Sequence, residues 1–140
     1  MQINYKNKHE LENIYFHDSY FNGFTYDYEA RTISFCSERY EKITNTNKFE
    51  KKGFIITFNN VILCDFQSCH FWGKGNMMNY LALDEPCEKF DGLLETKRSD
   101  YQSCEHSYMD TQTSYLPIEF LLNSGDKYLI ICESITYEEK

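Results

Sequence analysis

The segment that decides the fold runs from residue 116 to residue 137 and reads LPIEFLLNSGDKYLIICESITY. Two apolar runs in it flank the tetrapeptide Asn123-Ser124-Gly125-Asp126. Glycine adopts positive φ without steric cost, and Asn, Ser and Asp side chains bond to their own backbone in turns. Two strand-like runs joined by a short connection that contains glycine predict a β-hairpin.

The second run of this hairpin is apolar on both of its faces. One face carries Leu129, Ile131 and Ile135, and the other carries Tyr128, Ile130 and Cys132. A strand that is apolar on both faces is usually covered on both, which places it in the interior of a sheet. We therefore expect Lys127–Tyr137 to form one interior strand that pairs with Leu116–Leu122 in a mainly antiparallel sheet.

Other segments alternate between apolar and polar residues, as strands do. The expected strands are residues 14–28 and 32–36, which form a hairpin, and then residues 54–64, 66–72 and 77–83. Asn59-Asn60 predicts a bulge or bend in the strand that contains it. The polar residues 41–52 predict a solvated loop.

One segment has helical rather than strand-like spacing. Asp84 suits an N-cap and Pro86 suits the first helical turn. The apolar residues of the predicted helix, residues 85–96, are Cys87, Phe90, Leu93 and Leu94. A chain of 140 residues is long enough for one domain, residues 1–140. The expected fold class is α+β, mainly β: an antiparallel sheet, sandwich or open barrel with one short helix.

Composition narrows the function classes. Hydrophobic residues make up 41% of the chain and aromatic residues 17%, which excludes a disordered chain. The net charge of −8 and the pI of about 4.9 argue against nucleic-acid binding, which needs a basic surface. The N-terminus lacks the pattern of a signal peptide, and no apolar run is long enough to span a membrane. We expect a cytoplasmic protein that binds neither nucleic acid nor membrane.

Candidate chemistry is sparse. Cys64, Asp65, Cys69 and His70 lie close in sequence, but no CxxC spacing accompanies them, and neighbouring residues of a strand point to opposite faces. His17-Asp18-Ser19 holds the residue types of a catalytic triad, but adjacent residues do not converge, and a turn is the simpler interpretation. A Cys–His pair such as Cys104 with His106 remains open. We expect six free thiols, no metal, no cofactor and no enzymatic activity.

The acidic balance is the main indication of a partner. The candidate partner-binding residues are Glu85, Glu88 and Glu95 around the helix, Glu133 and Glu138 near the C-terminus, and Trp72 as an aromatic anchor. Carboxylates at an interface attract a basic protein and raise its association rate, and tryptophan is enriched at binding hot spots. The alternatives are that the carboxylates serve only solubility and that Trp72 packs in the core.

Three segments carry a resemblance that spans about residues 11 to 137. They are Phe16-His17-Asp18-Ser19 before residues 26–28 (YDY), then residues 68–73 (SCHFWG), then residues 124–126 (SGD) before Ile131-Cys132-Glu133-Ser134-Ile135. Their order resembles a family of small bacterial proteins of the low-GC Gram-positive group, similar to the immunity proteins that accompany polymorphic toxins. The resemblance implies a non-catalytic protein that binds and occludes a cognate toxin, and the acidity of the chain fits a basic toxin. The alternative is a small-molecule-binding barrel or a small enzyme with an aromatic-lined cavity.

Overall fold

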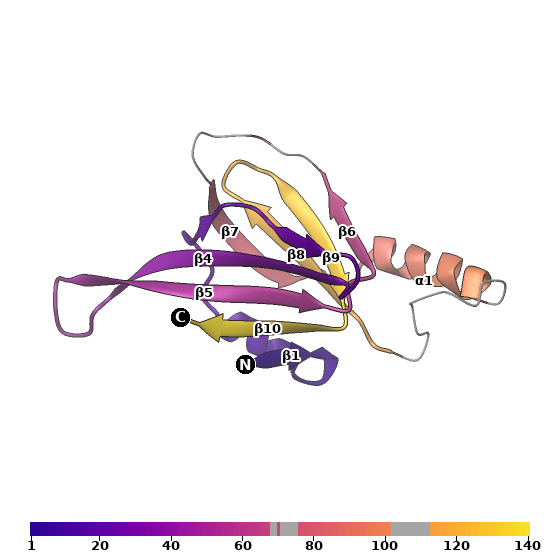
Figure 1. Cartoon of the computed structure of the whole chain (residues 1–140), viewed down its shortest axis with the longest axis horizontal. Coiled ribbons are helices and arrows are strands. Elements are labelled where there is room, and N and C mark those ends of the chain that lie inside the picture. The colour runs from indigo at the N-terminus through magenta and orange to yellow at the C-terminus, as the bar shows by residue number, and fades with distance from the viewer. Residues whose placement is uncertain (68–69, 71–75, 102–112) are drawn as a thin grey trace.

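The computed structural model describes residues 1–67, 70, 76–101 and 113–140, with only the backbone of residues 97–101. The structure is mainly β and consists of two five-stranded antiparallel sheets, one of them a half-barrel, with two short helices (Figure 1). The expected fold class is therefore confirmed. A 3₁₀ helix, η1 (Tyr5–Asn13), was not expected from the polar N-terminal sequence.

The strands divide between the sheets in the following order. The first sheet runs β1 (Gln2–Asn4), β10 (Ser134–Glu139), β5 (Phe49–Asn59), β4 (Thr32–Lys42) and β3 (Thr25–Asp27). The second runs β2 (Tyr20–Phe21), β7 (Asn76–Leu83), β8 (Leu116–Leu122), β9 (Lys127–Cys132) and β6 (Leu63–Phe66).

The predicted hairpin of β8 and β9 is confirmed, and β9 is an interior strand between β8 and β6. The prediction of a single strand over Lys127–Tyr137 is wrong. The chain breaks at Glu133, and β10 continues in the other sheet, where it lies between β1 and β5. Both β9 and β10 are interior strands, so the apolar pattern continues without a break where the chain passes from one sheet to the other.

The expected strand over residues 54–64 divides at the same corner. It separates into β5, which ends at Asn59, and β6, which begins at Leu63. Between the pairs Asn59–Ser134 and Leu63–Ile131, the β5–β6 side has three residues (60–62) and the β9–β10 side has two (132 and 133). The extra residue is a β-bulge, which bends a strand pair. The bend predicted at Asn59-Asn60 is thus confirmed, and Asn60 has φ of 50°.

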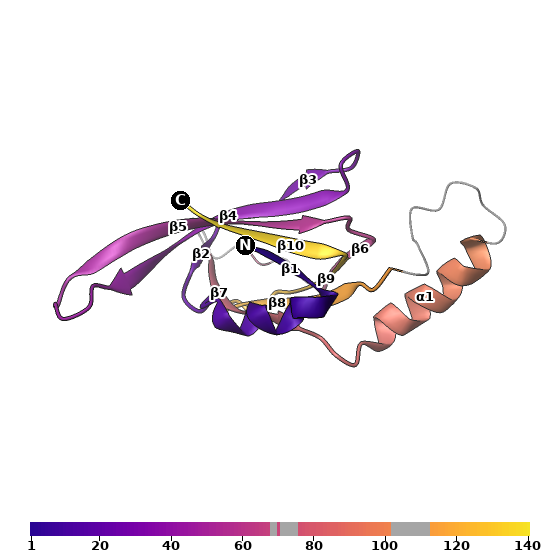
Figure 2. The same ribbon diagram turned by 90° about the horizontal axis from the view of Figure 1, so that it is seen from below.

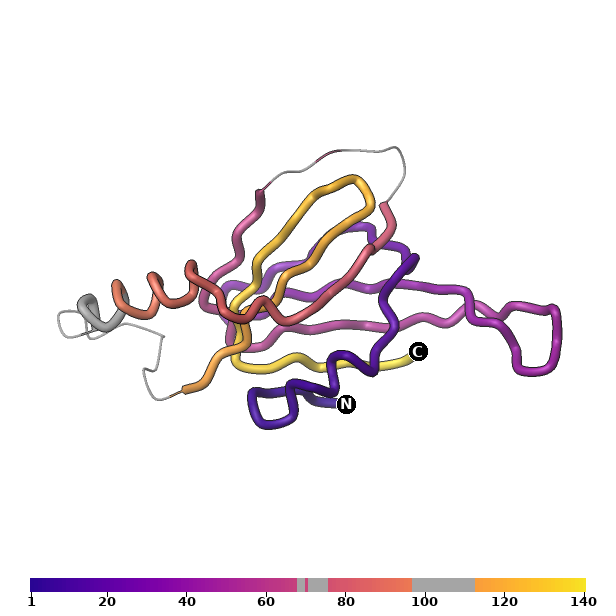
Figure 3. The backbone as a smooth tube through the Cα atoms, turned by 180° about the vertical axis from the view of Figure 1, so that it is seen from behind, coloured from indigo at the N-terminus to yellow at the C-terminus, as the bar shows by residue number. Residues whose placement is uncertain are grey.

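The expected loop over residues 41–52 is wrong. These residues extend β4 and β5 into a hairpin with ladder pairs out to Lys42–Phe49, and its end projects beyond the rest of the sheet (Figures 1 and 3). Neither face of the projecting end is buried, so its sequence lacks the alternation of apolar and polar residues that marks a half-buried strand. For this reason the sequence pattern resembles that of a loop. The expected strand over residues 66–72 meets β6 only at Phe66, and most of it lies outside the described residues.

The main core lies between the two sheets. Its centre is aromatic: Phe21, Phe35, Phe58 and Phe120 are buried, and the ring of Phe120 lies 5.1 Å from that of Phe21 and 5.5 Å from that of Phe35. Such offset and edge-on ring pairs stabilise a core beyond the area that they bury. A second, smaller cluster lies on the outer face of β9, around Leu129 and Ile131.

The predicted helix is present as α1 (Glu88–Tyr101), which starts and ends later than expected. Phe90, Leu93 and Leu94 pack against the second cluster, so the apolar stripe read from the sequence is the face that contacts the sheet. The rest of α1 extends away from the sheets (Figure 2). Within the described residues, no helix is long and apolar enough to cross a membrane.

Candidate functional site

The predicted partner-binding carboxylates do not form one patch. Glu88 and Glu95 lie exposed on α1, together with Asp91. Glu138 is exposed near the end of β10, at the opposite end of that strand from the corner at Glu133. The predicted anchor Trp72 lies outside the described residues, so its role remains a prediction.

Two of the predicted carboxylates have partners inside the chain. The Lys8 ammonium lies 2.7 Å from Glu85 Oε2 and 2.9 Å from Oε1, which ties η1 to the segment that precedes α1. The side-chain amide of Asn60 donates to Glu133 Oε2 at 2.6 Å. A partner protein would have to replace these contacts, whereas Glu88 and Glu95 make no ion pair with any described side chain.

A histidine–carboxylate pair forms between two residues that no sequence pattern connects. Asp126 is almost fully buried, with 1% of its side chain exposed, whereas 62% of the His70 side chain is exposed. Asp126 Oδ1 lies 2.5 Å from His70 Nδ1, and Asp126 Oδ2 accepts the backbone N–H of His70 at 2.7 Å. A carboxylate on one ring nitrogen fixes the orientation of the ring and leaves the other nitrogen to act elsewhere.

This pair could not be read from the sequence. The two residues are 56 positions apart, and Asp126 had the appearance of a turn residue after Gly125. The turn is real, since Gly125 has φ of 89°. The burial of the Asp126 carboxylate and its contacts with His70 are long-range features of the fold, which no local sequence pattern encodes.

The other sequence candidates do not converge. His17 and Asp18 form an exposed pair with Nδ1 and Oδ2 3.1 Å apart, whereas Ser19 is fully buried. Asp18 has φ of 60°, which supports the interpretation as a turn. Among the described side chains, no group of three His, Cys, Asp or Glu residues could hold a metal ion. Cys69, Cys104 and His106 lie outside the described residues.

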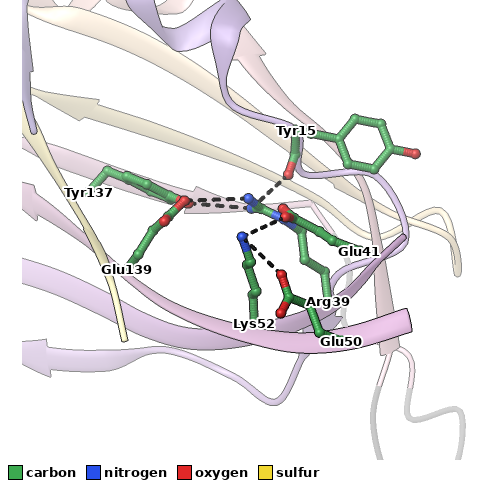
Figure 4. A network of polar contacts seen from close by, with 7 residues as sticks. All are labelled: Tyr15, Arg39, Glu41, Glu50, Lys52, Tyr137 and Glu139. Atoms are coloured by element: carbon green, nitrogen blue, oxygen red, sulfur yellow. Dashed lines mark hydrogen bonds and ion pairs between the residues drawn. The ribbon is translucent and has the colours of Figure 1, made fainter. Parts of the chain in front are cut away.

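A buried arginine organises a polar network at the base of the projecting hairpin (Figure 4). Only 9% of the Arg39 side chain is exposed, and its Nε lies 2.6 Å from Glu41 Oε1. Its Nη1 donates to the carbonyl oxygen of Tyr15 at 3.1 Å and to the Tyr137 hydroxyl at 3.4 Å. The guanidinium therefore joins β4, β10 and the segment after η1, which is a structural role.

Comparison of the chain with protein-family models, with curated proteins and with solved structures found no match. The function proposed below therefore rests on the residues and their geometry, together with the resemblance described above.

Proposed function

We propose that this protein is a non-catalytic protein-binding module and that the acidic face of α1 contacts a basic surface of its partner. The observation that carries the proposal is the arrangement of Glu88, Asp91 and Glu95. Residues three and four apart share one side of a helix. These carboxylates are exposed, while the apolar residues of α1 face the sheet.

The local charge balance supports an external partner. Residues 84–95 carry five carboxylates and one lysine. That lysine, Lys89, pairs with Asp65, and Glu85 pairs with Lys8. Glu88, Asp91 and Glu95 are left without an opposite charge among the described side chains. Like charges one helical turn apart destabilise a helix, and a basic partner would relieve that repulsion.

The hypothesis of an immunity-type protein specifies the kind of partner. A basic toxin has the charge that the acidic face of α1 would attract, and occlusion of such a toxin requires no catalytic residue. Glu138 and Trp72 would then be additional contacts. Glu85 and Glu133 would contribute only if they exchanged their internal partners for the toxin.

Charge reversal tests the proposal on the partner recovered by co-purification. The double variant Glu88→Lys/Glu95→Lys changes the net charge by the same amount as the control Glu12→Lys/Glu29→Lys, whose two carboxylates are also exposed. We expect the α1 variant to slow association about tenfold at low salt and to change dissociation less, because charges act on the diffusional encounter.

The control variant and the salt dependence decide the outcome. We expect the control to associate nearly as the unaltered protein does, and association to slow as salt rises because the Debye length is about 8 Å at physiological ionic strength. Equal effects of the two variants would mean that net charge alone matters. If the association rate changes neither with salt concentration nor in the α1 variant, the acidic face of α1 is not the contact surface.

A further inference from the structure

A cleft of about 260 Å³ opens where β5 turns away from its neighbour β4 and becomes β6. The last backbone bond across the junction runs from the N–H of Val61 to the carbonyl oxygen of Arg31 at 2.9 Å. Beyond it, β6 pairs with β9 in the second sheet, while the β3–β4 hairpin stays in the first. The cleft therefore forms because the strands separate at the corner, where β5 ends and β6 joins the other sheet.

The walls of the cleft are aromatic. The rings of Tyr26 and Phe66, which both line the cleft, contact each other edge-on, with centroids 6.1 Å apart and planes at 87°. Tyr26 and Phe66 are 46% and 47% exposed, and Tyr28, which also lines the cleft, is 94% exposed. The buried Ile33 and the half-buried Val61 line the cleft as well. Aromatic surface left in water inside a concave site is typical of a ligand pocket.

Among the described residues, the cleft is lined by one cationic side chain, and residues of the corner fix its position. Arg31 lines the cleft, and its Nη2 donates to Asn60 Oδ1 at 3.0 Å. Both residues have positive φ, 53° for Arg31 and 50° for Asn60, so the corner fixes the backbone from which the guanidinium extends. The planar fork of arginine matches a carboxylate better than an ammonium does. Asp27 also lines the cleft, but its Oδ1 accepts the N–H of Ala30 at 2.9 Å within the turn.

We propose that this cleft binds a small aromatic carboxylate, with the ring against Tyr26 and Phe66 and the carboxylate on Arg31. The volume lies below the roughly 300–1,000 Å³ of pockets for drug-sized ligands, so the ligand has one or two rings. Cys64 does not oppose an anion, because burial raises the pKa of its thiol to about 11 and leaves it neutral. This site goes beyond the proposed protein-binding function and uses no residue of α1.

Three probes that share one benzene ring and differ in charge separate the contributions of ring and charge. They are benzoate, benzyl alcohol and benzylamine, each titrated near neutral pH into the ¹⁵N-labelled full chain and followed by NMR. We expect shifts around residues 26–33 and 61–66. We expect benzoate to bind about tenfold more tightly than benzyl alcohol because of the charge-assisted bond to arginine. Benzylamine should bind most weakly.

Two variants and a control complete the test. Arg31→Gln should reduce benzoate binding to the level of benzyl alcohol, and Val61→Trp should abolish binding of all three by filling the cleft. Phe66→Ala replaces Val61→Trp if that variant does not fold, and should weaken all three probes together. Leu83→Trp, in a separate depression near Tyr15, should change nothing.

Several results would overturn the proposal: no binding of any probe, shifts confined to another surface, tighter binding of benzylamine, or benzoate binding that Arg31→Gln leaves unchanged. The proposed function fails or stands separately, because Glu88→Lys/Glu95→Lys should leave benzoate binding intact.

Discussion

The Asn60 side-chain amide donates to the Glu133 carboxylate at 2.6 Å, across the corner at which two neighbouring strands change sheets together. Asn60 sits in the bulge between β5 and β6, and Glu133 is the single residue between β9 and β10. The N–H of Glu133 in turn donates to the carbonyl oxygen of Asn59 at 3.0 Å. This side-chain contact and this backbone bond connect the two strand pairs at the corner, next to the backbone bond from the N–H of Ile62 to the carbonyl oxygen of Ile131 at 2.9 Å.

Removal of the Glu133 carboxylate should weaken this corner. We expect Glu133→Ala to lower the free energy of unfolding by about 1–2 kcal/mol, because a half-buried amide loses a charged acceptor. Urea denaturation measures the change. The control Glu138→Ala removes an exposed carboxylate from the same end of the chain and should stay within about 0.5 kcal/mol. Equal losses in the two variants would show that the contact across the corner contributes nothing.

The corner also shows why the fold could be predicted only in part. The hairpin of β8 and β9 follows from its apolar runs and from Gly125. The change of sheet at Glu133 leaves no trace in that pattern, because Ile131 before it and Ile135 after it are both fully buried. An apolar pattern predicts that a residue is buried, but it does not predict to which of the two sheets the residue belongs.

The projecting hairpin and the His70–Asp126 pair could not be predicted from the sequence, each for its own reason. The end of the hairpin has water on both faces, so its ladder is supported by charged pairs such as Lys51–Glu38 at 2.5 Å instead of by apolar alternation. The pair of His70 and Asp126 joins residues that are 56 positions apart in the sequence, so no local pattern indicates it. The acidic residues of α1 were predictable as exposed because the apolar stripe of the helix fixes its opposite face.

The Arg39–Glu41 pair predicts a pH-dependent contribution to stability. The hydrogen bond from Arg39, and then that from Lys52, lower the pKa of Glu41 below its usual 4.5. A carboxyl group whose pKa is lowered by folding contributes stability that is complete above the unfolded pKa and is lost as the pH falls through the folded value. We therefore expect Glu41→Gln to be destabilising at neutral pH and to differ progressively less from the unaltered protein below pH 4.5.

Urea denaturation at a series of pH values from about 7 to about 2 measures this difference. Glu29→Gln is the matched control, because Glu29 is exposed and makes no ion pair with any described side chain. The control should differ little from the unaltered protein throughout. A destabilisation by Glu41→Gln that is the same at both ends of the series would contradict an electrostatic role for Glu41.

The buried Asp126 carboxylate should control the exchange of one backbone amide. Its Oδ2 accepts the N–H of His70 at 2.7 Å, so this N–H should exchange slowly with solvent. We expect Asp126→Asn to accelerate that exchange by about tenfold or more and to lower stability by about 1–3 kcal/mol, because a buried acceptor is altered. Hydrogen-exchange NMR gives the first quantity. Asp65→Asn, whose carboxylate pairs with Lys89, should leave the His70 amide unchanged.

The four described cysteines should differ widely in their reactivity with iodoacetamide. Cys36, Cys64, Cys87 and Cys132 are free thiols, but only Cys36 is exposed. Burial raises the pKa of Cys64 to about 11 and raises that of the fully buried Cys132 further still. The thiolate is the reactive form, so a raised pKa and burial both slow alkylation. We expect Cys36 to react first, Cys64 slowly, and Cys132 only on unfolding.

Mass spectrometry of peptides from a timed alkylation series assigns each rate. A second series in concentrated guanidinium chloride removes the fold, and there the rates of the four cysteines should converge and all six thiols of the chain should be alkylated without prior reduction. Fewer than six would reveal a disulfide. Alkylation of Cys132 in the native protein as fast as that of Cys36 would mean that β9 opens readily, because its thiol is covered by both sheets. Such opening is at odds with an interior strand, since the strands of a core exchange only at a cost close to that of global unfolding.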